Sequence, residues 1–119
     1  MALARHQLII PEPPLQLLPT LAKDIGIGEA LILQQLHYLT LNENNGKVLN
    51  GERWIYNTYE DWQSKYFPFW STRTIKTYIT SMEERELIIS CQPEGRKSRR
   101  KYYRLSDEWN PLSATNRRV

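Results

Sequence analysis

The chain has 119 residues, a net charge of +3 at neutral pH, and 40% hydrophobic residues. This length allows one domain with a modest core, and the apolar content excludes a disordered chain. No apolar run approaches the length of a membrane span, and the first residues do not follow the pattern of a secretory signal. Because Cys91 is the single cysteine, an internal disulfide is excluded and a cysteine zinc site is not expected.

The charge is distributed unevenly. Residues 1–72 carry five basic and seven acidic side chains, whereas residues 73–104 carry nine basic and four acidic ones. Lysine and arginine release the counterions of a polyanion when they bind it, so such a stretch favours a nucleic-acid partner. A solvated surface is the alternative interpretation, and the local structure must distinguish the two.

The N-terminal part predicts short elements. Residues 7–10 are apolar and favour an edge strand. Three prolines within residues 11–14 impose an extended entry, and the last of them suits the first turn of a helix. Leucines at helical spacing extend this helix to about Asp24, although Pro19 disturbs its first half. Gly26-Ile27-Gly28 then breaks the pattern.

The middle of the chain predicts a helix, a loop and a strand. The helix runs from Glu29 to about Leu41 and has a broad apolar face. Residues 42–51 are polar and rich in asparagine and glycine, which predicts a loop. Residues 53–57 are aromatic and β-branched, which predicts a short strand.

Two further helices follow, joined by a short turn. Thr58 and Asp61 match the capping box, in which each side chain accepts a hydrogen bond from the other residue's backbone N–H. The helix they begin should end near Tyr66, before Pro68-Phe69-Trp70. Ser71 then has the chemistry of an N-cap for a helix that ends near Arg85.

Residues 87–92 and 101–105 are strand-like, and the polar segment between them predicts a hairpin. Helix, strand, helix, turn, helix and hairpin is the order of a winged helix-turn-helix, whose second paired helix enters the major groove. We therefore expect a mainly α domain with a small β hairpin (α+β) over residues 1–106. Residues 1–27 would be an N-terminal extension and residues 107–119 a flexible tail.

The helix after Ser71 has a polar face suited to DNA. At 100° per residue, Lys76, Thr77 and Thr80 lie within about 60° of Arg73. Short threonines allow close approach to bases, and basic side chains donate to guanine or phosphate. A merely solvated face is the alternative, and Glu84 on this face counts against groove binding. The candidate DNA contacts here are Ser71, Thr72, Arg73, Lys76, Thr77 and Thr80.

The predicted hairpin carries six basic residues within positions 96–104 and no acid in that span. This density favours a wing on the DNA backbone or in the minor groove over a solvated turn. Strand alternation leaves the directions of Lys101 and Arg104 open. The candidate DNA contacts in the wing are Arg96, Lys97, Ser98, Arg99, Arg100 and Lys101.

Aromatic side chains are dense between Trp54 and Trp70. Single-strand stacking is one interpretation of this density, but core packing is favoured. Of Tyr102 and Tyr103, one should face the core and the other solvent or DNA. No residue pattern supports catalysis, because the histidines are isolated and the acids lack a nucleophile or a metal-ligand set. We expect no enzyme, no metal and no cofactor.

Several blocks carry a resemblance to a known family: Pro13-Pro14-Leu15 with Leu18-Pro19, Gly28-Glu29-Ala30, Leu33-Gln34-Gln35-Leu36-His37-Tyr38, the block 54–63 (WIYNTYEDWQ) and the block 67–75 (FPFWSTRTI). They resemble the winged-helix N-terminal domains of phage and mobile-element replication initiator, or replisome-organiser, proteins of DnaD-like architecture. The similarity covers roughly residues 8–106. It implies binding at a replication origin or a related site, and self-association through the N-terminal segment. The chain differs from the pattern of this family in two ways. It has a short tail where such proteins usually have a C-terminal region that engages helicase-loading partners, and its wing is more basic than expected for the family.

Taken together, the residues predict a sequence-specific, double-stranded DNA-binding protein of phage, plasmid or mobile-element replication or its transcriptional control. We expect it in the cytoplasm, associated with the nucleoid. A homodimer or homo-oligomer and contacts with replication proteins stay open. One alternative is a protein-interaction module that associates through Leu8–Leu21 and the aromatic surface without binding DNA. Another is RNA binding through the same hairpin.

Overall fold

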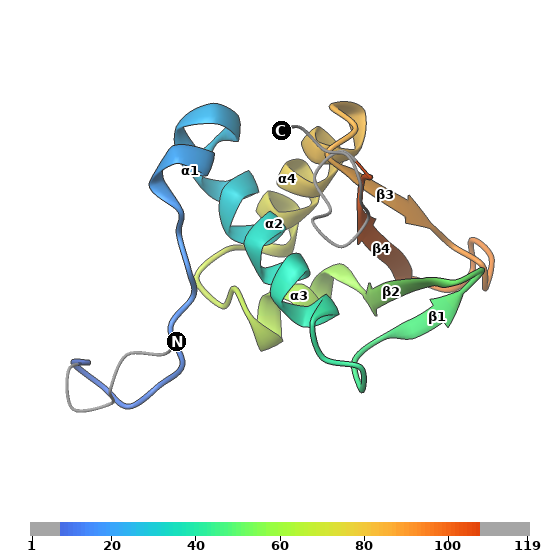
Figure 1. The fold of residues 1–119 in the computed structure, drawn as a ribbon, viewed down its shortest axis with the longest axis horizontal. Helices are drawn as coiled ribbons and strands as arrows, with labels where there is room; N and C mark the ends of the chain where they lie inside the picture. Colours follow the sequence, from blue (N-terminus) through green and yellow to red (C-terminus); the bar gives the residue numbers. More distant parts are fainter. Residues whose placement is uncertain (1–7, 108–119) are drawn as a thin grey trace.

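A computed structural model describes residues 8–107. Within them, the chain forms an α+β domain with four helices and a four-stranded antiparallel sheet. In Figure 1, α2 crosses in front of α4, the sheet lies to one side and α1 to the other. The elements are α1 (Pro19–Ile25), α2 (Ile27–Thr40), β1 (Lys47–Leu49), β2 (Glu52–Asn57), α3 (Tyr59–Lys65), α4 (Thr72–Glu84), β3 (Ile88–Cys91) and β4 (Lys101–Leu105).

Residues 108–119, most of the predicted tail, lie outside the described part of the chain. None of the helices in residues 8–107 is both long and apolar enough to span a membrane.

The first helix begins later than predicted. It starts at Pro19, which takes the first helical position, where a missing N–H costs nothing. It ends at Gly26, whose φ of 111° favours glycine and whose N–H donates to the Ala22 carbonyl at 2.8 Å. Residues 8–10, predicted as part of an edge strand, are not in a strand. Together with the prolines that follow, they extend away from the body of the domain (Figure 1).

The long helix is confirmed, with α2 beginning two residues before the predicted start. Gly28 lies inside it, so only Gly26 interrupts the helical pattern. A Cβ at Gly28 would lie 2.4 Å from the Tyr78 ring on α4, so α2 and α4 approach too closely here for a larger residue. The side chains that α2 buries in the core are Ala30, Ile32, Leu33, Leu36 and Leu39.

The loop prediction for residues 42–51 is wrong at β1. Leu49 pairs with Glu52, so Asn50 and Gly51 alone connect β1 to β2. Their φ values of 53° and 81° are positive, as a two-residue type I′ hairpin requires. Asn-Gly is the preferred sequence for that turn, so the sequence contained the signal for this hairpin.

Both predicted helix starts are confirmed at α3 and α4. The Thr58 hydroxyl accepts from the Asp61 N–H at 3.0 Å, and the Asp61 carboxylate accepts from the Thr58 N–H at 3.0 Å. The Ser71 hydroxyl accepts from the Thr74 N–H at 3.1 Å. The two helices are therefore separated only by residues 66–71.

The sheet has the strand order β1-β2-β4-β3, so β4 lies between β2 and β3. Strand alternation places Ile55 and Tyr103 in the core beneath the helices. Tyr56 and its partner Tyr102 lie on the other face, with ring centroids 5.1 Å apart. Tyr102 is nevertheless buried and its hydroxyl donates to Glu94 at 2.6 Å, so the expectation that one of the two tyrosines is open to solvent is wrong.

Candidate nucleic-acid interface

The polar face of α4 carries two exposed cations. Arg73 and Lys76 form no ion pair or side-chain hydrogen bond with any of residues 8–107. The Thr77 hydroxyl donates to the Arg73 carbonyl at 3.0 Å, while Thr72 and Thr80 are half-buried. Three residues of the opposite face are fully buried, namely Ile75, Ile79 and Met82. The predicted division of this helix into a core face and a polar face is therefore confirmed.

Ser71 acts locally as the cap of α4. Its oxygen accepts from the Thr74 N–H, and its hydroxyl donates to Thr74 Oγ1 at 3.1 Å. Both interactions hold the first turn of the helix. The hydroxyl of this predicted contact residue is thus already engaged within the protein.

Glu94 organises the loop between β3 and β4. Its carboxylate accepts from the guanidinium of Arg100 at 2.9 Å, from the Tyr102 hydroxyl at 2.6 Å and from the Ser98 hydroxyl at 3.1 Å. The Arg100 and Tyr102 hydrogen bonds are the main causes that lower the pKa of Glu94 to about 2. Ser98, predicted as a DNA contact, also accepts from the Arg100 N–H at 3.2 Å. These hydrogen bonds hold the β3–β4 loop in its conformation.

Two more basic side chains at the base of the hairpin contact acids. The Arg99 guanidinium pairs with Glu60 of α3. The Lys101 ammonium lies 2.7 Å from the Glu83 carboxylate of α4 and 3.4 Å from the Tyr59 hydroxyl. Partial burial lowers the pKa of Lys101, but the hydrogen bond and charge of Glu83 outweigh it and raise that pKa above its usual value.

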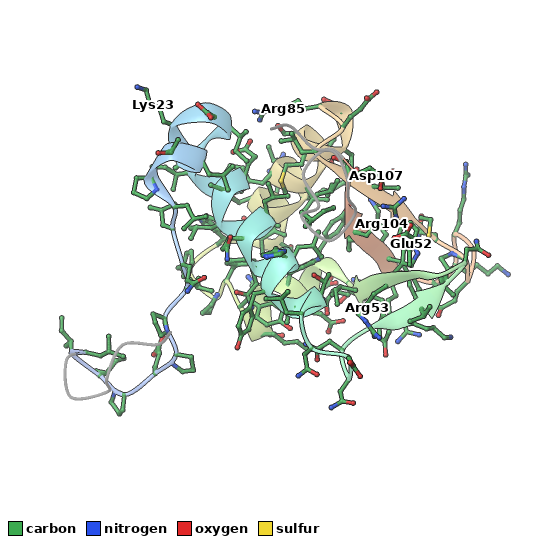
Figure 2. All side chains as sticks on the ribbon, in the orientation of Figure 1. Lys23, Glu52, Arg53, Arg85, Arg104 and Asp107 are labelled. Atoms are coloured by element: carbon green, nitrogen blue, oxygen red, sulfur yellow. The ribbon has the colours of Figure 1, made fainter. Side chains whose placement is uncertain are left out.

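Positions 96–104 contain no acid, but the fold brings acids from outside this span to the basic cluster. Three glutamates outside positions 96–104 neutralise Arg99, Arg100 and Lys101. Arg104 is also engaged, since it pairs with Asp107 at 3.0 Å and lies over the Trp54 ring at 5.3 Å on the outer face of the sheet (Figure 2).

Arg96 and Lys97 at the loop tip differ from the rest of the cluster. Both side chains are exposed, and neither has an ion-pair or hydrogen-bond partner within the described part of the chain. The predicted wing therefore holds two free cations at its tip. The cations at its base are used within the protein.

The hairpin lies against the polar side of α4. Glu83 is about 20° from Lys76 around the helix axis, two turns further along. Its carboxylate accepts from the Ser90 hydroxyl of β3 at 2.6 Å as well as from Lys101 of β4. At the base of the loop, Arg99 contacts the start of α3. The side of α4 that carries Glu83 and Lys76 therefore packs against β3 and β4, and the start of α3 contacts the β3–β4 loop.

Sequence reasoning missed the three glutamates, for different reasons. Glu94 lies two residues before the basic span, so its closeness in the sequence could have indicated a contact with these cations. Glu83 shares the Lys76 side of the helix, and the short connection to β3 pointed to a contact there. Glu60 is separated from Arg99 by 39 residues, and no local pattern links them.

Comparisons with models of known protein families, with curated proteins and with solved structures find no match for this chain. The resemblance to replication initiator proteins therefore stays a prediction from the sequence.

Proposed function

We propose that this chain is a winged helix-turn-helix domain that binds double-stranded DNA, with α4 in the major groove and the β3–β4 loop as the wing. The element order supports this proposal: apart from the additional strand β1 after α2, the elements α2, β2, α3, α4 and the β3–β4 hairpin follow one another as in that fold. The pairing of β4 with both β2 and β3 joins the wing to the helical core.

The observation that carries the proposal is a set of four cations, on α4 and on the β3–β4 loop, that have no partner among residues 8–107. Two lie on α4 and two at the loop tip, and the Glu83 contacts hold α4 against β3 and β4, the two strands that carry this loop. Free cations bind phosphates with release of counterions, whereas cations already paired gain much less. The four residues are Arg73, Lys76, Arg96 and Lys97.

The roles differ by position. Arg73 and Lys76 would donate to guanine or to phosphate. The short side chains of Thr77 and Thr80 would allow α4 to lie close to the base edges. Thr72 suits a phosphate contact at the helix start. In the wing, the tip would bind the backbone or the minor groove while the base holds the hairpin in shape.

The biological role that we propose is non-enzymatic: DNA binding in replication initiation of a phage, plasmid or other mobile element, or in its transcriptional control. The sequence resemblance alone supports this choice of process. The cationic surface supports DNA binding independently of it.

The test is binding of a fluorescently labelled random-sequence duplex, measured by anisotropy at several salt concentrations. These four cations should contribute about −3.6 to the slope of log K against log salt. The variant Arg73→Ala/Lys76→Ala/Arg96→Ala/Lys97→Ala should lose most of that slope. Lys23→Ala is the control for the loss of a single exposed cation elsewhere, because Lys23 lies on α1, on the side away from the sheet (Figure 2). Salt-independent binding, or equal binding by both variants, contradicts the proposal.

Sequence choice needs a second measurement. Selection of bound sequences from a random duplex pool should give a preferred site, and Arg73→Ala should cost about 1–3 kcal/mol at that site and relax the preference. Competition by duplex RNA separates DNA binding from the RNA alternative.

A second candidate function rests on the N-terminal segment. Ile9 is fully exposed, and Ile10 is 56% exposed. Exposed apolar side chains on an extended segment favour association with another protein surface. This candidate predicts concentration-dependent self-association that is insensitive to salt, with no binding of duplex DNA, and sedimentation velocity measures it.

A further inference from the structure

The Arg99–Glu60 pair differs from the other ion pair between the hairpin and the helices. The side chains of Arg99 and Glu60 are 74% and 54% exposed, whereas those of Lys101 and Glu83 are 20% and 24% exposed. Glu83 also accepts from a serine hydroxyl, but Arg99 and Glu60 bond only to each other among residues 8–107. Because water screens so exposed a pair, it adds little stability and opens readily.

The pair also lies at the rim of the proposed interface. Glu60 follows Tyr59, which contacts Lys101 at the base of the wing, and Arg99 follows the loop tip by two residues. A guanidinium binds carboxylate and phosphate with the same fork of N–H donors. Glu60 therefore holds Arg99 by the same chemistry that a DNA phosphate would use.

We propose that Glu60 competes with DNA phosphate for Arg99 and so limits the affinity of the domain for duplex DNA. On binding, the pair opens and Arg99 transfers to a phosphate. This inference rests on the proposed DNA-binding function and adds to it a residue that lowers affinity.

A double-mutant cycle tests the proposal, using Glu60→Gln, Arg99→Ala and the two combined. The probe is the labelled random-sequence duplex at low salt. Glu60→Gln should bind about three- to tenfold more tightly than the unaltered protein, because one phosphate competitor is removed. In the Arg99→Ala background the same substitution should gain less than about twofold, since the competed side chain is absent.

Glu43→Gln is the charge-matched control. Glu43 is exposed in the α2–β1 connection and bonds to none of residues 8–107, so this variant should stay within about twofold of the unaltered protein. The thermal midpoint of Glu60→Gln should stay close to that of the unaltered protein, which separates an effect on binding from one on folding.

The outcomes are distinguishable. If the unaltered protein binds duplex DNA but Glu60→Gln does not bind more tightly, the competition is overturned and the DNA-binding function stands. An equal gain with and without Arg99 also overturns it, since Glu60 then acts only through its general charge. If neither the unaltered protein nor Glu60→Gln binds duplex DNA, both proposals fail.

Discussion

The tip and the base of the β3–β4 hairpin carry the same kinds of side chain in different surroundings. At the tip, Arg96 and Lys97 are exposed and have no partner within residues 8–107. At the base, Arg100 and Lys101 each bond to a glutamate and lie over aromatic rings. A count of basic residues therefore overestimates the charge available to a polyanion. The capacity to bind DNA depends on which cations the fold leaves free.

The largest expected effect is at the tip. The double substitution Arg96→Ala/Lys97→Ala should weaken duplex binding about 10- to 100-fold near physiological salt and reduce the salt slope by about two. Anisotropy at several salt concentrations measures both, and urea unfolding should show unchanged stability. A loss per removed charge that is as large with Lys23→Ala would mean that net charge alone matters.

The base should behave in the opposite way. Lys101→Met keeps the apolar stem but leaves Glu83 with only the Ser90 hydroxyl, so the free energy of unfolding should fall by about 1–2 kcal/mol, less than for a fully buried pair. The salt slope of DNA binding should not change. Urea unfolding and anisotropy give the two quantities. A slope reduced by one at unchanged stability would make Lys101 a phosphate contact and remove the distinction between tip and base.

Much of the helical framework was predictable because its signals are local. The Thr58–Asp61 capping box and the Ser71 cap act within four residues, and both helices begin where these residues predict. The start of the first helix is hard to predict because a proline within leucines at helical spacing favours an interruption, whereas Pro19 occupies the first helical position. β1 was missed because a polar composition outweighed the Asn50-Gly51 turn signal.

The candidate site was less predictable than the framework. The polar face of α4 follows from helical periodicity, and the residues that a 100° rotation per residue places on this face are exposed or half-buried. Whether a basic side chain is free depends on what tertiary structure brings next to it. Glu60 and Arg99 come from different elements, so their pairing has no signature in the sequence.

A smaller effect separates capping from DNA contact at the start of α4. Ser71→Ala should lower the free energy of unfolding by about 1 kcal/mol, because the Thr74 N–H loses its acceptor. Ser71→Asp restores an acceptor and should recover most of that stability. Duplex binding of Ser71→Ala, measured where the variant is fully folded, should equal that of the unaltered protein. A loss of affinity there would show that the hydroxyl contacts DNA.

The smallest effect concerns the carboxylate that shapes the base of the wing. The pKa of Glu94 is lowered from 4.5 to about 2, chiefly by the Arg100 hydrogen bond, so its bonds favour the ionised form. The stabilisation of the loop should therefore be complete above about pH 4.5 and be lost as the pH falls from there through about 2. Backbone amide shifts of Ser98 and Arg100 in a two-dimensional NMR titration measure this transition.

Glu94→Gln provides the control for this titration. An amide accepts weaker hydrogen bonds from Arg100 than a carboxylate does, so the loop should be less ordered at neutral pH and the acid transition should disappear. A transition in the unaltered protein centred near pH 4.5 would mean that Glu94 is not held by Arg100 and Tyr102. In that case Arg100 would join the free cations of the tip, and the boundary between the two regions would move toward the strands.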